Sequence, residues 1–184
     1  MKFCVTKEHS FSDIEKFLFP VNQFGEEKRR KGMYDDWDEE AHTIQWLKKV
    51  MRFIQSGEAG ELTIYYLEED GTIIASAFTL TGSNLTKDML EQNGITTACG
   101  KVAHFSCFHV LEAFRGKGRG SAWLFREILP DLRNQGVNEV YIKSSHHSAL
   151  PLYERFGTKI GSYISISDSK LYQRYGYIYK ITLS

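Results

Sequence analysis

The chain has no excess of either charge and no long apolar run. Among its 184 residues, 23 are Lys or Arg and 23 are Asp or Glu. Nothing in the overall charge therefore favours nucleic acid or an anionic membrane as a partner. No segment approaches the roughly 20 apolar residues that a membrane-spanning helix needs, and residues 1–7 lack the apolar core of a signal peptide. We expect a protein that stays in the cytoplasm.

Cysteine is scarce, and its spacing excludes two kinds of site. Cys4, Cys99 and Cys107 are the only three cysteines, an odd number without the spacing of metal ligands. We expect free, reduced thiols rather than a disulfide framework. The pair His146-His147 has no further ligand at a sensible distance in sequence. We therefore predict no metal.

Repeats, low-complexity tracts and linkers are also missing. Hydrophobic residues make up 42% of the chain and charged residues 25%, which are ordinary values for a globular protein. The length suits one domain able to bury a real core. We expect a single domain over residues 1–184.

What the chain does contain is a glycine-rich, basic turn between an apolar strand and an amphipathic helix. Its three glycines let the backbone curl, so that successive N–H groups can point into one concavity. The following helix start adds unpaired donors and the positive end of its dipole. Such a turn predicts a phosphate or pyrophosphate site. The residues of the turn are Arg115, Gly116, Lys117, Gly118, Arg119, Gly120 and Ser121.

Two common nucleotide-binding motifs fit this turn poorly. A P-loop needs Gly-Lys followed by Ser or Thr, whereas Lys117 is followed by Gly118. A dinucleotide-binding turn needs Gly-x-Gly-x-x-Gly and an acid about twenty positions later. The spacing here is Gly-x-Gly-x-Gly, and the nearest acid, Glu139, starts the next apolar run.

The pattern Arg115-x-x-Gly118-x-Gly120 instead resembles the acyl-coenzyme A signature of the GNAT superfamily of N-acetyltransferases. A second stretch is similar to that family's other signature, Asn-x-x-Ala-x-x-Leu-Tyr-Glu-x-x-Gly-Phe. It departs from the signature at His146, where Asn is usual, and at Thr158, where an aromatic residue is usual. The matching positions are Ala149, Leu152, Tyr153, Glu154 and Gly157.

The resemblance implies the α/β (α+β) GNAT fold. That fold is a mixed, mostly antiparallel sheet of about seven strands flanked by about four helices, with the fourth and fifth strands splayed apart. Sequence periodicity predicts matching strands over residues 2–6, 62–67, 72–80, 102–110, 140–143, 159–166 and 177–183. A hairpin turn with Asp70-Gly71 joins the second and third of these strands.

Helices are predicted between these strands. A capping box, Ser12 to Glu15, opens a helix that stops before Pro20, and residues 20–36 are expected to be irregular. Apolar spacing predicts a helix from Ala41 until Gly57. Another follows the glycine turn and should kink at Pro130. Shorter helices are expected at 86–92 and 149–156.

The resemblance also implies how acetyl-CoA, the co-substrate, would bind. The glycine turn would hold the pyrophosphate, and pantetheine would lie between the splayed strands by backbone hydrogen bonds. A bulge near Val110 would present a backbone N–H to the thioester oxygen. The other residues expected beside pantetheine are Phe108, His109, His146, Ala149 and Tyr153.

Tyr153 is the predicted general acid. The family tyrosine at this position lies near the coenzyme sulfur, and a phenol of pKa about 10 can protonate a leaving thiolate. The alternative is a tyrosine that only packs.

His104 is the candidate base. Without a bulge, His104, Ser106, Phe108 and Val110 alternate to the acceptor side of the fourth strand. His104 could then take the amine's proton through a water, or it could be an ordinary strand residue. Cys107 would face away, which favours direct transfer without an acyl-cysteine.

A bulge would swap these faces and turn His109 toward the cleft. Family members with a carboxylate base place it earlier on this strand, where the chain has Val102 and Ala103.

Acceptor identity depends on the segments that diverge from the family. Residues 20–40 combine acids with aromatic residues, and 167–176 could form a facing wall. Such walls would suit a cationic amine, although a solvated charge run is the plainer interpretation. The acceptor is an amine of a small molecule or of a protein, and a homodimer stays open. We expect an acetyl-CoA-dependent N-acetyltransferase acting by direct attack in a ternary complex. The alternative is a non-catalytic acyl-CoA sensor or scaffold.

Overall fold

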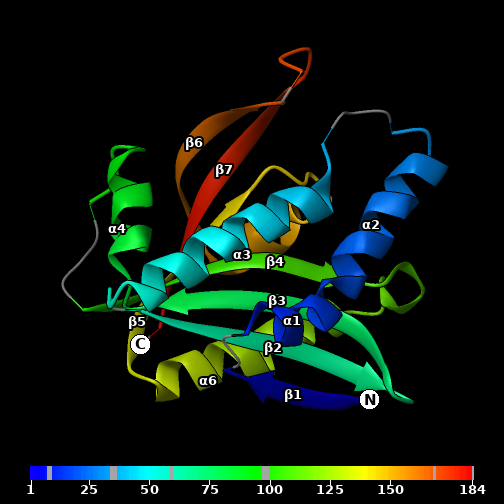
Figure 1. Ribbon diagram of the computed structural model, residues 1–184, viewed down its shortest axis with the longest axis horizontal. Helices are drawn as coiled ribbons and strands as arrows, with labels where there is room; N and C mark the ends of the chain where they lie inside the picture. The colour runs from blue at the N-terminus through cyan, green and yellow to red at the C-terminus, as the bar shows by residue number, and fades with distance from the viewer. Residues whose placement is uncertain (8–9, 34–36, 59, 97–99, 168, 184) are drawn as a thin grey trace.

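A single sheet organises the chain. The computed structural model describes residues 1–7, 10–33, 37–58, 60–96, 100–167 and 169–183. Its seven strands lie in the order β1-β2-β3-β4-β5-β7-β6 (Figure 1). Strands β4 and β5 pair in parallel and the other neighbours pair antiparallel, which confirms the predicted sheet. The strands are β1 (Lys2–Thr6), β2 (Glu61–Glu69), β3 (Thr72–Thr81), β4 (Lys101–Val110), β5 (Val137–Ser144), β6 (Thr158–Ile166) and β7 (Gln173–Thr182).

Helices cover both faces of the sheet. One core lies between the sheet and the N-terminal helices and contains Phe17, Leu47 and Phe78. The other lies beneath the helices that follow the glycine turn and contains Leu124 and its neighbours. No helix in the described ranges is long and apolar enough to cross a bilayer. The helices are α1 (Phe11–Glu15), α2 (Phe19–Arg30), α3 (Glu39–Gln55), α4 (Asn84–Glu91), α5 (Arg119–Trp123), α6 (Leu129–Asn134) and α7 (Leu150–Phe156).

The N-terminal helices differ from the prediction. Helix α1 starts at Phe11 after Ser10, and the expected capping box does not form. Residues 20–36 are not irregular, because α2 continues to Arg30. Pro20 lies in the first turn of α2, where its missing N–H breaks no hydrogen bond, so it opens a helix here.

Local signals elsewhere were confirmed. The helix expected from Ala41 is present as α3 and begins two residues earlier, at Glu39. Asp38, which was not singled out from the sequence, caps it by accepting a 2.9 Å hydrogen bond from Ala41 N–H. The β2–β3 turn places Asp70 at φ +50° and Gly71 at φ +75°, the conformation that two-residue hairpins favour. Near Pro130 the helix widens into a π turn, Leu124–Ile128, which accommodates the proline's missing N–H and its ring.

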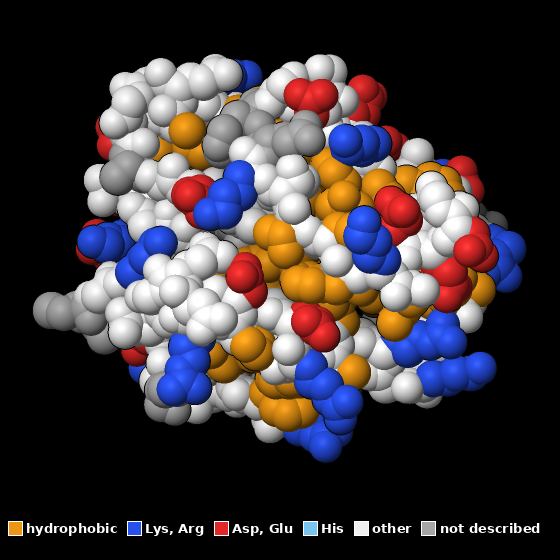
Figure 2. All heavy atoms as spheres, turned by 90° about the horizontal axis from the view of Figure 1, so that it is seen from below, with side chains coloured by type: hydrophobic (Ala, Val, Ile, Leu, Met, Phe, Trp, Pro, Cys, Tyr) orange, Lys and Arg blue, Asp and Glu red, His pale blue; other side chains and the backbone are white. Residues whose placement is uncertain are grey.

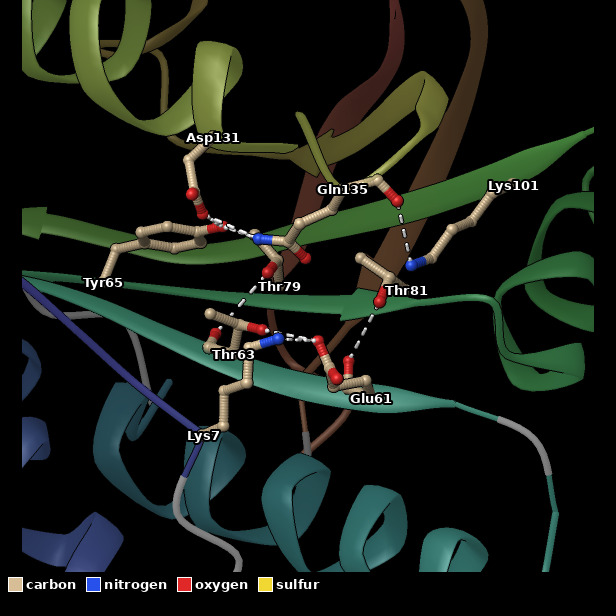
Figure 3. Close-up of polar contacts among 9 residues, drawn as sticks. All are labelled: Lys7, Glu61, Thr63, Tyr65, Thr79, Thr81, Lys101, Asp131 and Gln135. Carbon is tan, nitrogen blue, oxygen red and sulfur yellow. Dashed lines mark hydrogen bonds and ion pairs between the residues drawn. The ribbon is translucent and has the colours of Figure 1, made fainter. Parts of the chain in front are cut away.

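A partly buried cluster of polar side chains fixes the far end of α6 to the sheet (Figure 3). Tyr65 donates its hydroxyl to Asp131 over 2.7 Å, and Gln135 Nε2 donates to the same carboxylate over 2.7 Å. Lys101 Nζ reaches the Gln135 carbonyl at 3.2 Å. These bonds hold the helical segment that begins at the glycine turn against β2 and β4.

Charge is mixed over the molecular surface. On the face seen in Figure 2, acidic and basic side chains surround a central group of apolar ones. The pattern agrees with the balanced composition.

Strand β4 carries the predicted bulge, which overturns the simple alternation of its side chains. Ser76 pairs with His109 and Phe78 with Ser106, so two residues of β4 oppose one of β3. Cys107, within the bulge, has φ +54°, a conformation that costs a non-glycine residue energy. Pairing with β5 ends at Phe105, beyond which the two strands splay apart.

The bulge moves side chains to opposite faces of the sheet. Phe108 stacks on Trp123 at 5.4 Å between ring centroids, on the α5 side. His104 instead lies 5.8 Å from the Trp46 ring of α3. The expectation that His104 and Phe108 share a face is therefore wrong, because it assumed an unbroken register.

Candidate active site

A cavity of about 570 Å³ opens where β4 and β5 separate. Its walls come from α2, α3, β4, the glycine turn, the end of β5, α7 and β6. Lys117 is the only predicted site residue that does not line it, and that residue is exposed. The predicted residues gathered in its walls are His104, Phe108, His109, Val110, Arg115, Gly116, Gly118, Arg119, Gly120, Ser121, His146, Ala149 and Tyr153.

The glycine turn uses the conformational freedom of two of its glycines. Gly116 and Gly118 adopt φ +84° and +69°, the left-handed region that glycine enters without strain. Space beside Gly118 is open, since a Cβ built there meets no atom within 4 Å. A Cβ on Gly120 would lie 3.4 Å from the Phe108 ring. The helix start, with its unpaired N–H groups, therefore lies close against the bulged strand.

Arg115 makes contacts with β4 and with α2. Its Nε donates to the Val110 carbonyl over 2.6 Å, and its Nη1 lies 2.6 Å from Glu27 of α2. The guanidinium also lies over the Phe24 ring. Arg115 thus ties the glycine turn to α2, which leaves Lys117 and Arg119 as the more adaptable charges at the rim.

His104 lies on the α3 side of the sheet at the base of the splay. Burial, with a smaller effect from the Lys143 charge, lowers the pKa of His104 to about 4. The ring is therefore neutral at pH 7. It can accept a proton, but it is a weaker base than an ordinary histidine.

His109 and His146 face each other beneath α2. The Phe24 ring lies 5.1 Å from His109 and 5.2 Å from His146. Burial and the neighbouring His146 lower the pKa of His109 to about 3. His146 also approaches Glu39, with Nε2 3.6 Å from the carboxylate.

Tyr153 enters the cavity from α7. Its ring packs 5.8 Å from Tyr179, and the residue is only 4% exposed. Burial, and secondarily Cys107 across the splay, raise the pKa of Tyr153, so the phenol keeps its proton. Its hydroxyl has no hydrogen-bond partner among the residues that the structure describes.

Cys107 lies on the cavity wall, contrary to the expectation that it faces away. The bulge turns its Sγ toward α3, where Thr43 Oγ1 lies 3.7 Å away. Burial raises the pKa of the thiol to about 11. Cys107 is therefore a protonated thiol at neutral pH and a poor nucleophile.

Glu39 joins the two segments predicted to wall the acceptor. Its carboxylate lies 3.0 Å from Lys28 of α2 and 2.8 Å from Arg174 of β7. Burial alone would raise the pKa of Glu39, but the charges of His146, Arg174 and Lys28 outweigh it and lower the pKa. Sequence reasoning gave this carboxylate no partner, because the Arg174 contact spans 135 positions. Tyr34, Asp35, Asp36 and Asp168, which belong to the same predicted walls, lie outside the described residues.

Lys143 is a second wall residue that the sequence did not single out. It lies near the end of β5, and its Nζ is 4.1 Å from the centre of the Tyr163 ring of β6. The prediction treated it only as the last residue of a short strand. Its neighbours in the cavity come from other strands, so no local motif marked it.

Comparison with solved structures supports the same architecture. A putative GNAT acetyltransferase from Desulfovibrio desulfuricans is 12% identical, with a TM-score of 0.60 and all of both chains covered. An N-acetyltransferase from Staphylococcus aureus Mu50 is 15% identical, with a TM-score of 0.57 and the same coverage. A putative acetyltransferase from Salmonella typhimurium, solved with its cofactor acetyl-CoA, is 11% identical, with a TM-score of 0.55. That match covers 100% of this chain and 95% of the other. At such identities these matches show the fold.

The family is shown by a sequence match instead. A comparison with the curated proteins gave no match. The family model for the acetyltransferase (GNAT) family matches residues 26–158, from α2 to the start of β6 and including both signatures. The chain therefore belongs to the acetyltransferase (GNAT) family, enzymes that use acetyl-CoA.

Proposed function

We propose that this protein moves an acetyl group from acetyl-CoA to a primary amine by direct attack in a ternary complex. One observation carries the proposal: a single cavity joins the glycine turn, the β4 bulge, Tyr153 and the α3 side of the sheet. A coenzyme that enters from the glycine turn and an amine that enters from the α3 side of the sheet would meet where β4 and β5 separate.

The glycine turn and the splayed strands would hold the coenzyme. Backbone N–H groups beside Gly118 and Gly120 suit the pyrophosphate, with Lys117 and Arg119 adding charge. Beyond Phe105, β4 has no strand partner on the β5 side. Its free backbone groups could pair with pantetheine as a strand would, and a bulge N–H could bind the thioester oxygen.

Tyr153 would donate the proton that the leaving thiolate needs. Its raised pKa keeps the phenol protonated at neutral pH, so it has a proton to give as negative charge develops on the leaving sulfur. His104 would accept the proton of the amine through a water, being neutral above its pKa of about 4. Direct transfer agrees with the thiol of Cys107, whose pKa of about 11 disfavours an acyl-cysteine.

We place the reaction in the cytoplasm. Cys4 and Cys107, the cysteines within the described ranges, are free thiols, as a reducing compartment favours.

A thiol-release assay with acetyl-CoA across a panel of amines tests the proposal, beside a titration with coenzyme A. Release that depends on the amine, with a matching acetylated product, would support the transferase. Tight coenzyme binding without turnover on any amine would favour the alternative, a non-catalytic acyl-CoA sensor.

A further inference from the structure

We propose that Lys143 binds an anionic group of the acceptor, so that the acceptor is a small amine that also carries a carboxylate or a similar oxyanion. This inference rests on the proposed acetyl transfer and names its substrate class. It replaces the cationic acceptor that the acidic segment 20–40 suggested.

The location of Lys143 supports this role. It lies on β5 one residue after Ile142, the last β5 residue that pairs with β4. Its side chain lines the cavity on the same face as His104, whose pKa its charge helps to lower. One small acceptor molecule could therefore place its amine beside His104 and another of its groups beside the Lys143 ammonium.

The charge of Lys143 is left for a ligand. Its Nζ lies 4.1 Å from the centroid of the Tyr163 ring, and it makes no ion pair with any residue within the described ranges. Among the cavity-lining residues that the structure describes, the only carboxylate is Glu39. Lys28 and Arg174 already engage that carboxylate, so it neither neutralises Lys143 nor offers an open site to an ammonium group.

Lys143 is exposed, and its surroundings favour contact with an anion that enters the cavity. Trp46 and Tyr163 line the same cavity, and the Tyr163 ring lies against the ammonium group. Partial desolvation lowers the pKa of Lys143, and no acid among the described residues offsets this effect. A carboxylate bound beside Lys143 would stabilise the charge of its ammonium group. The hydrogen bond between them would be charge-assisted, and such bonds are among the stronger polar contacts.

Matched acceptors and a matched control variant test the assignment. The acceptors are α-amino acids, each paired with its carboxamide, which keeps the amine and removes the negative charge. The variant is Lys143→Met, and Lys143→Arg serves as the conservative change. Lys159→Met is the control, because Lys159 lies at the same 4.1 Å from a tyrosine ring, that of Tyr177, but does not line the cavity.

The parent should acetylate the amino acids with a lower KM than their carboxamides. Lys143→Met should raise KM for the amino acids about tenfold or more and change the carboxamides little. Lys143→Arg should restore part of the difference, and Lys159→Met should behave as the parent. Coenzyme affinity and melting temperature, measured for each variant, would identify a misfolded one.

Two results would overturn the assignment in distinguishable ways. Equal use of both acceptors by the parent, or an equal loss on both in Lys143→Met, would remove Lys143 from acceptor recognition while acetyl transfer stands. Coenzyme binding without transfer to any amine would overturn the proposed function and this assignment with it.

Discussion

At the scale of single residues, the active-site side chains act through protonation states that burial controls. His104, His109, Cys107 and Tyr153 all line one cavity, and burial is the largest cause of each pKa shift. Each is pushed toward its neutral form, since desolvation penalises charge. The proposed site thus offers neutral acids and bases, while the charged phosphates of the coenzyme would lie at the glycine turn.

Tyr153→Phe should lower kcat by about a hundredfold while coenzyme affinity changes little. The ring continues to pack against Tyr179, and only the hydroxyl is lost. Steady-state kinetics and a coenzyme titration on parent and variant check this. A kcat within about twofold of the parent would return Tyr153 to a packing role.

His104→Ala should lower kcat/KM by about a hundredfold without changing the shape of its pH profile between pH 6 and 9. The pKa of His104 is about 4, so the ring is already neutral throughout that range. A rise in activity near the pKa of an ordinary histidine should therefore be missing from the parent. The rise in activity should instead follow the pKa of the amine.

Two amines of different pKa separate these cases. Profiles that shift with the amine support a relay through neutral His104. A parent limb near pH 6.5 that vanishes in His104→Ala would contradict the lowered pKa. An unchanged rate in the variant would mean that solvent takes the proton.

At the scale of elements, the glycine turn depends on its contacts with α2 and β4. Arg115 links the turn to Glu27 of α2 and to the Val110 carbonyl of β4. Gly120 lets α5 approach Phe108. The proposed coenzyme site is therefore built from three elements, although one short motif marks it in the sequence.

Gly118→Glu should abolish coenzyme binding without unfolding the protein. The space around Gly118 is open, so a side chain fits, but its negative charge would oppose the pyrophosphate. Gly118→Ala is the matched control: it bears the left-handed backbone cost of about 1 kcal/mol and adds no charge. Calorimetric titration with coenzyme A checks both variants. Unchanged affinity in Gly118→Glu would contradict the coenzyme site.

At the scale of the whole molecule, buried histidines couple stability to pH. The folded-state pKa values of His104 and His109, about 4 and about 3, lie below the value of 6.5 for free histidine. The unfolded chain therefore binds more protons between these values, and stability falls as pH drops through that window. Other titrating groups add their own contributions.

The melting temperature should accordingly fall between pH 6.5 and pH 4. Replacing His109 by Phe should flatten this dependence, because a neutral aromatic ring keeps the contact with Phe24 and removes one titrating group. Differential scanning fluorimetry across this range checks it. A slope equal to that of the parent would mean that His109 does not contribute.

Local pattern alone predicted much of the fold. Alternation placed the strands, the Asp70-Gly71 turn formed as expected, and the two signatures identified the family. These features succeed because each depends on neighbours within a few residues, where backbone preferences and side-chain periodicity act directly. Helix α2 was not predicted from local pattern. Its charged residues Glu27 and Lys28 are buried by partners that lie outside the segment.

The arrangement of the site was decided by tertiary structure. The bulge at Cys107 exists only through pairing with β3, and it determines which side chains of β4 reach the acceptor side. The Glu39–Arg174 contact joins residues that are 135 positions apart. The sequence by itself determined the family and marked the glycine turn, because both depend on short motifs. Which charges remain unpaired in the cavity depends on contacts across the sheet, and no short stretch of sequence records them.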